Sequence, residues 1–280
     1  MSSIMSEQTI IHFQKMHGLG NDFIIIDARE NHLTLTTQQI QSICDRKTGI
    51  GCDQMVFLRH SKNWQEMTYM DMYNNDGSVI EACGNMTRCV AHLLMSEEGV
   101  DNVILETMAG SLNCWREGGN LVKVDMGKPR LNWQDIPLSQ SCDTLNLPLD
   151  GDPVGVNIGN PHCVFFVDDA KNMDDETLEE LGRYFETHEL FPEKTNVEFA
   201  QILSPSHIRL RVWERASGIT GACGTGACAT AVAAIRRGLT DRSVTITLDG
   251  GDLKIEWRAD DSSILMTGPV KHVFSGEYIL

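Results

Sequence analysis

The chain has 280 residues, and 41% of them are hydrophobic, which is enough to bury one large core or two of ordinary size. Its 23 Lys and Arg residues stand against 39 Asp and Glu residues, giving a net charge of −16. Because we find no basic patch, this charge argues against nucleic acids and anionic membranes as partners. No apolar run reaches the length of a membrane span and no signal peptide is evident, so we expect a cytoplasmic protein.

The nine cysteines show no regular spacing. Their odd number argues against a disulfide framework, and we expect a reducing compartment in which a special cysteine is catalytic or binds a metal. They are Cys44, Cys52, Cys83, Cys89, Cys114, Cys142, Cys163, Cys223 and Cys228.

Strands dominate the elements predicted in the first half. Short β-rich runs bounded by turn residues cover 10–15, 23–27, 55–59, 67–73 and 103–107, and a Gly118-Gly119 turn joins 110–116 to 120–126 as a hairpin. A helix is predicted over 37–46, where a Thr cap precedes Ile40, Ile43 and Cys44 on one face. A second helix, over 84–96, directly follows Cys83.

The second half has the same character. Strands are predicted over 163–168, 196–201, 207–213, 243–248, 252–257 and 263–266. An amphipathic helix is predicted over 174–188, because it starts with acidic residues and places apolar side chains on one face. Another helix, over 224–237, follows Cys223 and consists mainly of small residues. Because that helix has no bulky polar face, we expect a curved sheet to surround it.

Three pairs of motifs indicate an internal duplication. The pairs, each displaced by about half the chain and all in the same order, are Gly20-Asn21-Asp22-Phe23 with Gly159-Asn160-Pro161-His162, Gln54-Met55-Val56-Phe57 with Asn196-Val197-Glu198-Phe199, and Ala82-Cys83-Gly84-Asn85 with Ala222-Cys223-Gly224-Thr225. We therefore expect two related halves, each of which contributes one cysteine. Residues 129–153, rich in Pro, Ser and Asp, are predicted to link them.

Cys83 and Cys223 each stand where a strand turns into a helix, and each is followed by glycine. A helix N-terminus offers free N–H groups and a positive dipole end, which lower cysteine pKa values to roughly 3.5–7.5 and bind carboxylates. Two such cysteines suit a stereocentre, because one removes a proton from one face while the other returns a proton to the opposite face. We therefore predict an amino-acid racemase or epimerase that uses no cofactor.

Three other roles fit these cysteines less well. One Cys-Gly before a helix is most often a small buried residue, but a duplicated pair favours chemistry. The spacings of Cys83 to Cys89 and of Cys223 to Cys228 differ from those of zinc knuckles. Acyl transfer needs a base beside the cysteine, and the two symmetric cysteines do not supply one. No glycine-rich phosphate loop and no lysine motif for pyridoxal phosphate is evident.

The chain resembles the diaminopimelate epimerase family over nearly its whole length. The motifs that carry the resemblance are His17-Gly18-Leu19-Gly20-Asn21-Asp22-Phe23, Asn74-Asn75-Asp76-Gly77-Ser78, Cys83-Gly84-Asn85, Gly159-Asn160-Pro161-His162, Thr195-Asn196-Val197, Glu214-Arg215 and Ala222-Cys223-Gly224-Thr225-Gly226-Ala227-Cys228. The resemblance implies an α/β (α+β) fold of two similar domains, each a curved, mainly antiparallel sheet around a central helix. The expected domains are 1–127 with a returning strand at 268–280, and 128–267.

The resemblance also implies a reaction and a site. The reaction is the epimerisation of LL-2,6-diaminopimelate to meso-diaminopimelate, a step in lysine and cell-wall precursor biosynthesis. Cys83 and Cys223 are the implied acid–base pair. Backbone N–H groups of Gly84, Asn85, Gly224 and Thr225 are implied to hold the carboxylate at the reacting centre. The residues implied to grip the distal end are Asn21, Asn74, Asn160, Asn196, Glu214 and Arg215, with Gln54 lining the site.

His162 is predicted either to orient the site or to be a core histidine bonded to backbone. Two positions depart from the family pattern: Met86, where Gly or Ala is usual, could crowd the site, and Ile219 replaces a more usual acidic residue. We expect no metal, and a homodimer is a possible assembly.

Two alternative functions stay open at this point. A proline or hydroxyproline racemase shares the Cys223-Gly224-Thr225-Gly226 motif, but typically carries His where Asn85 stands and has less need of Glu214-Arg215. A non-catalytic redox sensor could use paired cysteines as a reversible disulfide, but it would need no substrate clamp.

Overall fold

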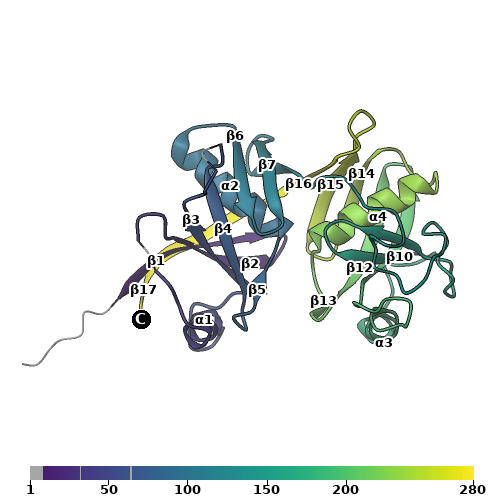
Figure 1. Cartoon of the computed structure of the whole chain (residues 1–280), viewed down its shortest axis with the longest axis horizontal. Helices are drawn as coiled ribbons and strands as arrows, with labels where there is room; N and C mark the ends of the chain where they lie inside the picture. Colours follow the sequence, from purple (N-terminus) through teal and green to yellow (C-terminus); the bar gives the residue numbers. More distant parts are fainter. Residues whose placement is uncertain (1–8, 32, 64) are drawn as a thin grey trace, which may run out of the picture. The chain divides into compact units, whose positions relative to one another are not determined.

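The computed structural model describes residues 9–31, 33–63 and 65–280. It consists of two compact units (Figure 1). Unit 1 comprises the described residues up to Cys114 together with Val270–Leu280, and unit 2 comprises Trp115–Pro269. The sequence-based division is at 127/128 and 267/268, whereas the contacts divide the chain at 114/115 and 269/270.

Unit 1 is built on a mixed sheet. Its strands lie in the order β17–β1–β2–β3–β4–β6; the β2–β3 and β4–β6 pairs are parallel and the others are antiparallel. The short β5 pairs with β4. The bounds are β1 (Ile10–Gly18), β2 (Asn21–Asp27), α1 (Thr37–Cys44), β3 (Gln54–Arg59), β4 (Thr68–Asn74), β5 (Val79–Ile80), α2 (Gly84–Glu98), β6 (Asn102–Thr107), β7 (Gly110–Arg116) and β17 (Lys271–Ile279).

Unit 2 repeats this plan and extends it. Its strands lie in the order β9–β10–β11–β12–β14–β15–β16–β8, with β10–β11 and β12–β14 parallel and the others antiparallel. The bounds are β8 (Leu121–Asp125), β9 (Val154–Asn157), β10 (Pro161–Phe166), α3 (Asp175–Glu186), β11 (Asn196–Ser204), β12 (His207–Glu214), β13 (Gly218–Ile219), α4 (Gly224–Arg236), β14 (Ser243–Leu248), β15 (Gly251–Trp257) and β16 (Ile264–Pro269). Because β8 pairs with β16, it belongs to unit 2.

The duplication predicted from the motifs is visible in the strand register. Phe23 of β2 lies opposite Gln54 of β3, and His162 of β10 lies opposite Asn196 of β11. In both units a parallel strand pair is followed by an antiparallel neighbour, β4 or β12. Each motif pair therefore occupies equivalent places in two copies of one fold.

Small residues let the sheet of unit 2 surround α4, as predicted. The helix is buried from Gly224 to Ala234 except at Thr225, and it contacts β9, β10, β11, β14, β15 and β16. In unit 1, α2 contacts β1, β2 and β6, and its residues Gly84–Ala91 are buried. Figure 1 shows both helices lying along the sheets of their own units. Bulkier side chains on α4 would push the strands apart.

The predicted helix ends are corrected by one or two residues. The helix predicted over 37–46 ends at Cys44, because Asp45 adopts an extended conformation, and its Thr36 cap accepts a hydrogen bond from the Gln39 N–H. The helix predicted over 84–96 continues to Glu98 and stops where Gly99 turns to a positive φ of 67°. Glycine adopts that conformation without steric cost, so it ends the helix.

Gly182 on α3 lies against Trp213 of β12, and a Cβ at this glycine would be 2.4 Å from the Trp213 Cγ. We therefore expect Gly182→Ala to lower the free energy of unfolding by about 1–3 kcal/mol, although alanine is the better helix former. Urea denaturation followed by circular dichroism measures the change. Glu179→Ala, on the exposed side of the same helix, is the control and should change stability by less than about 0.5 kcal/mol. Unchanged or increased stability of Gly182→Ala would contradict this packing.

Candidate active site

Cys83 and Cys223 occupy equivalent positions in the two units, as predicted. Each is the N-cap residue of its helix, α2 or α4, and has an extended backbone. The Cys83 side chain is half-buried, whereas Cys223 is only 4% exposed. The Cys223 Sγ accepts a hydrogen bond from the Gly226 N–H at 3.4 Å and lies 3.6 Å from the Thr225 hydroxyl. Both cysteines therefore stand at the N-terminus of a helix, where the first backbone N–H groups point toward the end of the helix.

The expectation of a lowered pKa is wrong for Cys223. Burial raises the pKa of the Cys223 thiol well above its ordinary value, and the Glu214 and Glu198 carboxylates raise it further. Hydrogen bonds from Thr225 and Gly226 act in the opposite direction but do not outweigh burial. In the ligand-free protein Cys223 is therefore a protonated thiol at neutral pH, ready to donate a proton.

Asn196 forms hydrogen bonds with backbone groups on two sides of it in unit 2. Its Nδ2 donates to the Pro161 carbonyl at 2.8 Å, and its Oδ1 accepts from the Arg215 N–H at 2.9 Å. The Arg215 guanidinium in turn donates to the Glu193 carbonyl, and the Thr220 hydroxyl donates to the Glu214 carboxylate. Both atoms of the Asn196 amide thus bond to backbone, so this residue holds β10 and the start of the Arg215 loop.

His162 forms side-chain hydrogen bonds, which corrects the alternative of a core histidine bonded to backbone. Its Nδ1 lies 2.6 Å from the Glu198 Oε1, and its Nε2 lies 2.9 Å from the Asn160 Oδ1. His162 and Glu198 are both fully buried. Sequence reasoning missed Glu198, although one signal was present: a charged residue stands in an otherwise apolar strand, where the repeat in unit 1 has Val56.

Amide side chains gather in unit 1. The Asn21 Nδ2 donates to Asp53 at 3.1 Å, and its Oδ1 accepts from the Asn85 Nδ2 at 3.2 Å. The Gln54 Nε2 donates to the Asn74 Oδ1 at 3.3 Å, on the neighbouring strand. The structure therefore brings Asn21 together with Asn85, and Gln54 together with Asn74.

An ion network behind Asn21 was not predicted. Asp22 and Asp53 each accept the backbone N–H of the other at 3.0 Å, and Arg46 bridges their carboxylates. Burial raises the pKa of Asp22, but hydrogen bonds from Arg46 and Lys15 outweigh it and hold that pKa below the ordinary value. This network fixes the Asp53 carboxylate that holds Asn21.

Of the two departures from the family pattern, one lies in the core and the other packs against it. Met86 is fully buried in the first turn of α2, and Ile219, on β13, packs against the core cluster that contains Trp213. Gly84, Asn85 and Gly224 are buried, and Thr225 is half-buried, at the two helix N-termini.

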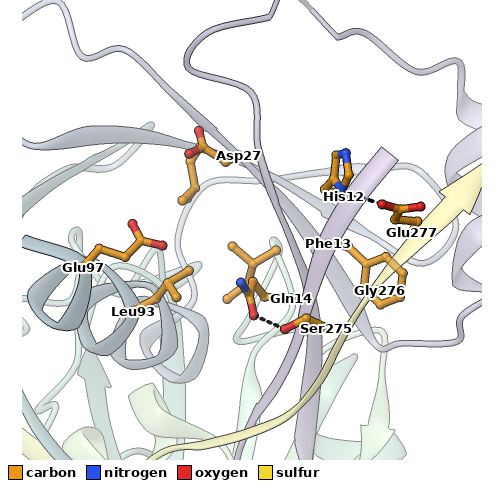
Figure 2. Close-up of a pocket in the computed structure, with 11 residues that line it drawn as sticks. His12, Phe13, Gln14, Asp27, Leu93, Glu97, Ser275, Gly276 and Glu277 are labelled. Atoms are coloured by element: carbon orange, nitrogen blue, oxygen red, sulfur yellow. Dashed lines mark hydrogen bonds and ion pairs between the residues drawn. The ribbon is translucent and has the colours of Figure 1, made fainter. Parts of the chain in front are cut away.

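A pocket of about 400 Å³ lies elsewhere in unit 1, among β1, β2, β17 and α2. Figure 2 shows its polar wall, where Gln14 contacts Ser275 and His12 contacts Glu277. No predicted site residue lines this pocket. Within residues 9–31, 33–63 and 65–280, no group of three or more His, Cys, Asp or Glu side chains could hold a metal ion, and no helix is long and apolar enough to cross a membrane.

Comparison with known sequences matches both halves of the chain. Residues 13–132 and 154–273 match the family model described as diaminopimelate epimerase. The chain is 52% identical to the diaminopimelate epimerase of Rhodospirillum centenum over 269 residues, 95% of this chain and 91% of the relative. It is 50% identical to that of Gluconobacter oxydans over 266 residues, 95% of this chain and 98% of the relative.

Comparison with solved structures identifies the fold. A phenazine biosynthesis protein of the PhzF family from Bacillus anthracis matches with a TM-score of 0.67 at 15% identity, covering 97% of this chain and 100% of that one. A hydroxyproline epimerase from Agrobacterium vitis matches with a TM-score of 0.67 at 13% identity, covering 98% and 93%. At these identities the likeness concerns the fold alone. The predicted α+β fold from a duplication is confirmed.

The reactivity of Cys223 should follow its buried, acidic surroundings. We propose to measure the rate at which iodoacetamide alkylates Cys223 as a function of pH, by peptide mass spectrometry. The midpoint of this pH profile should lie above the pH at which ordinary thiols ionise. Glu214→Gln removes a negative charge, so it should lower this pKa and speed alkylation near pH 8 by up to about tenfold. Glu256→Gln, exposed on β15, is the control and should leave the rate unchanged. A midpoint for the wild type below that of ordinary thiols would contradict the raised pKa of Cys223.

Proposed function

Because the chain belongs to the diaminopimelate epimerase family, we propose that it interconverts LL-2,6-diaminopimelate and meso-diaminopimelate without a cofactor. The enzyme is an isomerase, and its substrate is a small amino acid with an ammonium and a carboxylate at each end. The observation that carries the proposal is the repeated cysteine at the N-cap of α2 and α4, within a chain that matches this family in both halves.

The two cysteines act as an acid–base pair on one α-carbon. Cys83, as thiolate, removes the α-proton, and Cys223, as thiol, delivers its own proton to the opposite face of the carbanion. Afterwards Cys83 is the thiol and Cys223 the thiolate, so the reverse reaction uses the same groups with exchanged roles. The protonated state of Cys223 in the ligand-free protein supports its role as the first donor.

Backbone N–H groups stabilise the reacting carboxylate. Gly84 and Asn85 begin α2, while Gly224 and Thr225 begin α4, where the first N–H groups have no partner within the helix. Such donors, fixed before the reaction, stabilise negative charge as it develops on the carbanion and its carboxylate.

The distal end of the substrate is held by a clamp of Asn160, Glu214 and Arg215, in which Asn196 fixes the Arg215 backbone. Arg215 provides a planar fork for a carboxylate, and Glu214 accepts from an ammonium. In unit 1, Asn21, Gln54 and Asn74 contribute amide groups to the same task.

Neither alternative function is favoured. A proline or hydroxyproline racemase would share only a fold likeness at 13% identity, and here Asn85 stands where such enzymes carry His. A redox sensor would not need Glu214 and Arg215.

Removal of either thiol should abolish the reaction. In deuterated water, Cys83→Ala and Cys223→Ala should form meso-diaminopimelate at least about 10³-fold more slowly than wild type, because each reaction direction needs both groups. Proton NMR and mass spectrometry of the product measure the rate. Cys142→Ala, a half-buried cysteine far along the chain from either helix, is the control and should retain wild-type activity. Wild-type turnover by either mutant, or equal turnover of proline, would refute the proposal.

We also propose a cytoplasmic homodimer that binds neither nucleic acid nor membrane. All nine cysteines are free thiols, as in proteins of reducing compartments. Among the described residues β17 pairs with β1 alone, so it is a sheet edge, and Ile10, Val273, Phe274 and Ile279 on these two strands are about half exposed. An exposed apolar edge of this kind favours association with a second copy.

Charged residues on this edge should dissociate the dimer. Sedimentation velocity should show a dimer for wild type and a monomer for the Ile10→Asp/Ile279→Asp double mutant, whose charges cannot be buried cheaply. Leu203→Asp, equally exposed in unit 2, is the control and should remain dimeric. A monomeric wild type would contradict the assembly.

A further inference from the structure

Glu198 is a carboxylic acid at a position where burial is energetically unfavourable. It lies within the sheet of unit 2, between Val164 of β10 and Val212 of β12, and it is fully buried. Its Oε1 bonds to His162, while no described residue forms a hydrogen bond with its buried Oε2. A buried carboxyl group with an unsatisfied oxygen destabilises a fold, so its presence indicates a role other than stability.

The repeat in unit 1 shows what the fold itself requires here. Phe23 and Val56 stand in unit 1 where His162 and Glu198 stand in unit 2, since both pairs occupy equivalent registers of the parallel strands. Phe23 and Val56 are fully buried. An apolar pair therefore suffices to build this part of the sheet, and the polar pair in unit 2 is not needed for folding.

The hydrogen bonds of His162 determine where its hydrogens lie. The Asn160 Oδ1, 2.9 Å from Nε2, can only accept, so Nε2 carries a hydrogen and donates it. On the other side of the ring, Nδ1 and the Glu198 Oε1 share a second proton across 2.6 Å. With its oxygen held by His162, the Asn160 amide has an NH₂ group that forms no hydrogen bond with any described residue and can donate to a ligand.

We propose that Glu198 is a positioning residue which, through His162, fixes the Asn160 amide so that its NH₂ group donates to the distal carboxylate of the substrate. This inference rests on the proposed function and on the place of Asn160 in the clamp. In unit 1 the equivalent Asn21 is held differently, since protein groups engage both its Oδ1 and its Nδ2. The hydrogen-bonded chain from Glu198 through His162 to Asn160, which we call the relay, therefore distinguishes unit 2 from its repeat in unit 1.

The charges around the relay keep the shared proton in place. Burial raises the pKa of the Glu198 carboxyl, His162 lowers it, and Glu214 on β12 raises it. The thiols that face Glu198, Cys163 on β10 and Cys223 at the start of α4, both have pKa values raised well above the ordinary range, so they remain neutral. The proton shared by Glu198 and His162 offsets the negative charge that would otherwise accumulate beside Glu214.

The unit 1 pair supplies the test variant. The His162→Phe/Glu198→Val double mutant replaces the relay with the residues of the repeat, so it should fold. We expect KM for diaminopimelate to rise at least about tenfold, because a hydrogen bond to a charged group is lost. We expect kcat to change less than KM, since Glu198 acts on Cys223 only as the weaker of two nearby carboxylates. Glu198→Gln should recover most of the affinity, because its amide can still bond to Nδ1. Glu179→Gln on α3, exposed and remote in the fold, is the control. A wild-type KM, or a lost kcat with unchanged KM, in the double mutant would overturn the proposal.

Nitrogen-15 NMR of histidine-labelled wild-type protein tests the relay without any variant, because it shows which ring nitrogen of His162 carries a hydrogen. The His162 Nε2 should carry a hydrogen at neutral pH, because it faces the Asn160 Oδ1. An unprotonated Nε2 at neutral pH would overturn the proposal. This spectrum needs no substrate, so it tests the relay independently of the proposed function. The proposed function is tested separately, by deuterium incorporation into diaminopimelate.

Discussion

The Cys223 sulfur lies where two electrostatic effects oppose each other. The N-terminus of α4 and the Gly226 N–H favour a thiolate, whereas burial and the nearby carboxylates of Glu214 and Glu198 favour a thiol. Burial has the larger effect, because the desolvation of a thiolate is more unfavourable than its interaction with one helix N-terminus is favourable. A sulfur that is protonated in the ligand-free protein can act as an acid, and in the proposed reaction the other cysteine is then the base. The less buried Cys83 is suited to that role.

The position of Cys223 depends on the whole of unit 2. Its helix is surrounded by strands and is made of small residues, so the N-terminus is held rigidly. Fixed donors stabilise a developing negative charge without reorganising during the reaction. In unit 1 the same plan, with α2 in place of α4, holds Cys83. The internal duplication provides the two similar groups that the proposed reaction needs. Differences at equivalent positions, such as Phe23 against His162 and Asn74 against Glu214, make the two units chemically unlike.

Much of the scaffold was predictable because its signals are local. The Thr36 cap, the small residues of α4 and the Cys-Gly junctions each encode a feature within a few positions, and the motif pairs revealed the repeat. The Glu198–His162 bond was not predictable, since it depends on the parallel register of β10 and β11. Likewise, Arg46 bridges two aspartates only because the strand β2 and the start of β3 are adjacent. The raised pKa of Cys223 could not be foreseen either, because burial is a property of the packed unit rather than of the Cys-Gly motif.

In the proposed reaction, two different thiols act on the two faces of one carbon. The most direct measurement is the distribution of deuterium early in the reaction of LL-diaminopimelate in deuterated water. The thiol that donates exchanges with solvent before the substrate binds, whereas the proton taken by the other thiol stays with it. We therefore expect the first meso product to carry one α-deuterium while the remaining LL substrate carries almost none. Deuterium appearing equally in both pools, or product without deuterium, would show that a single base handles the proton and would contradict the account.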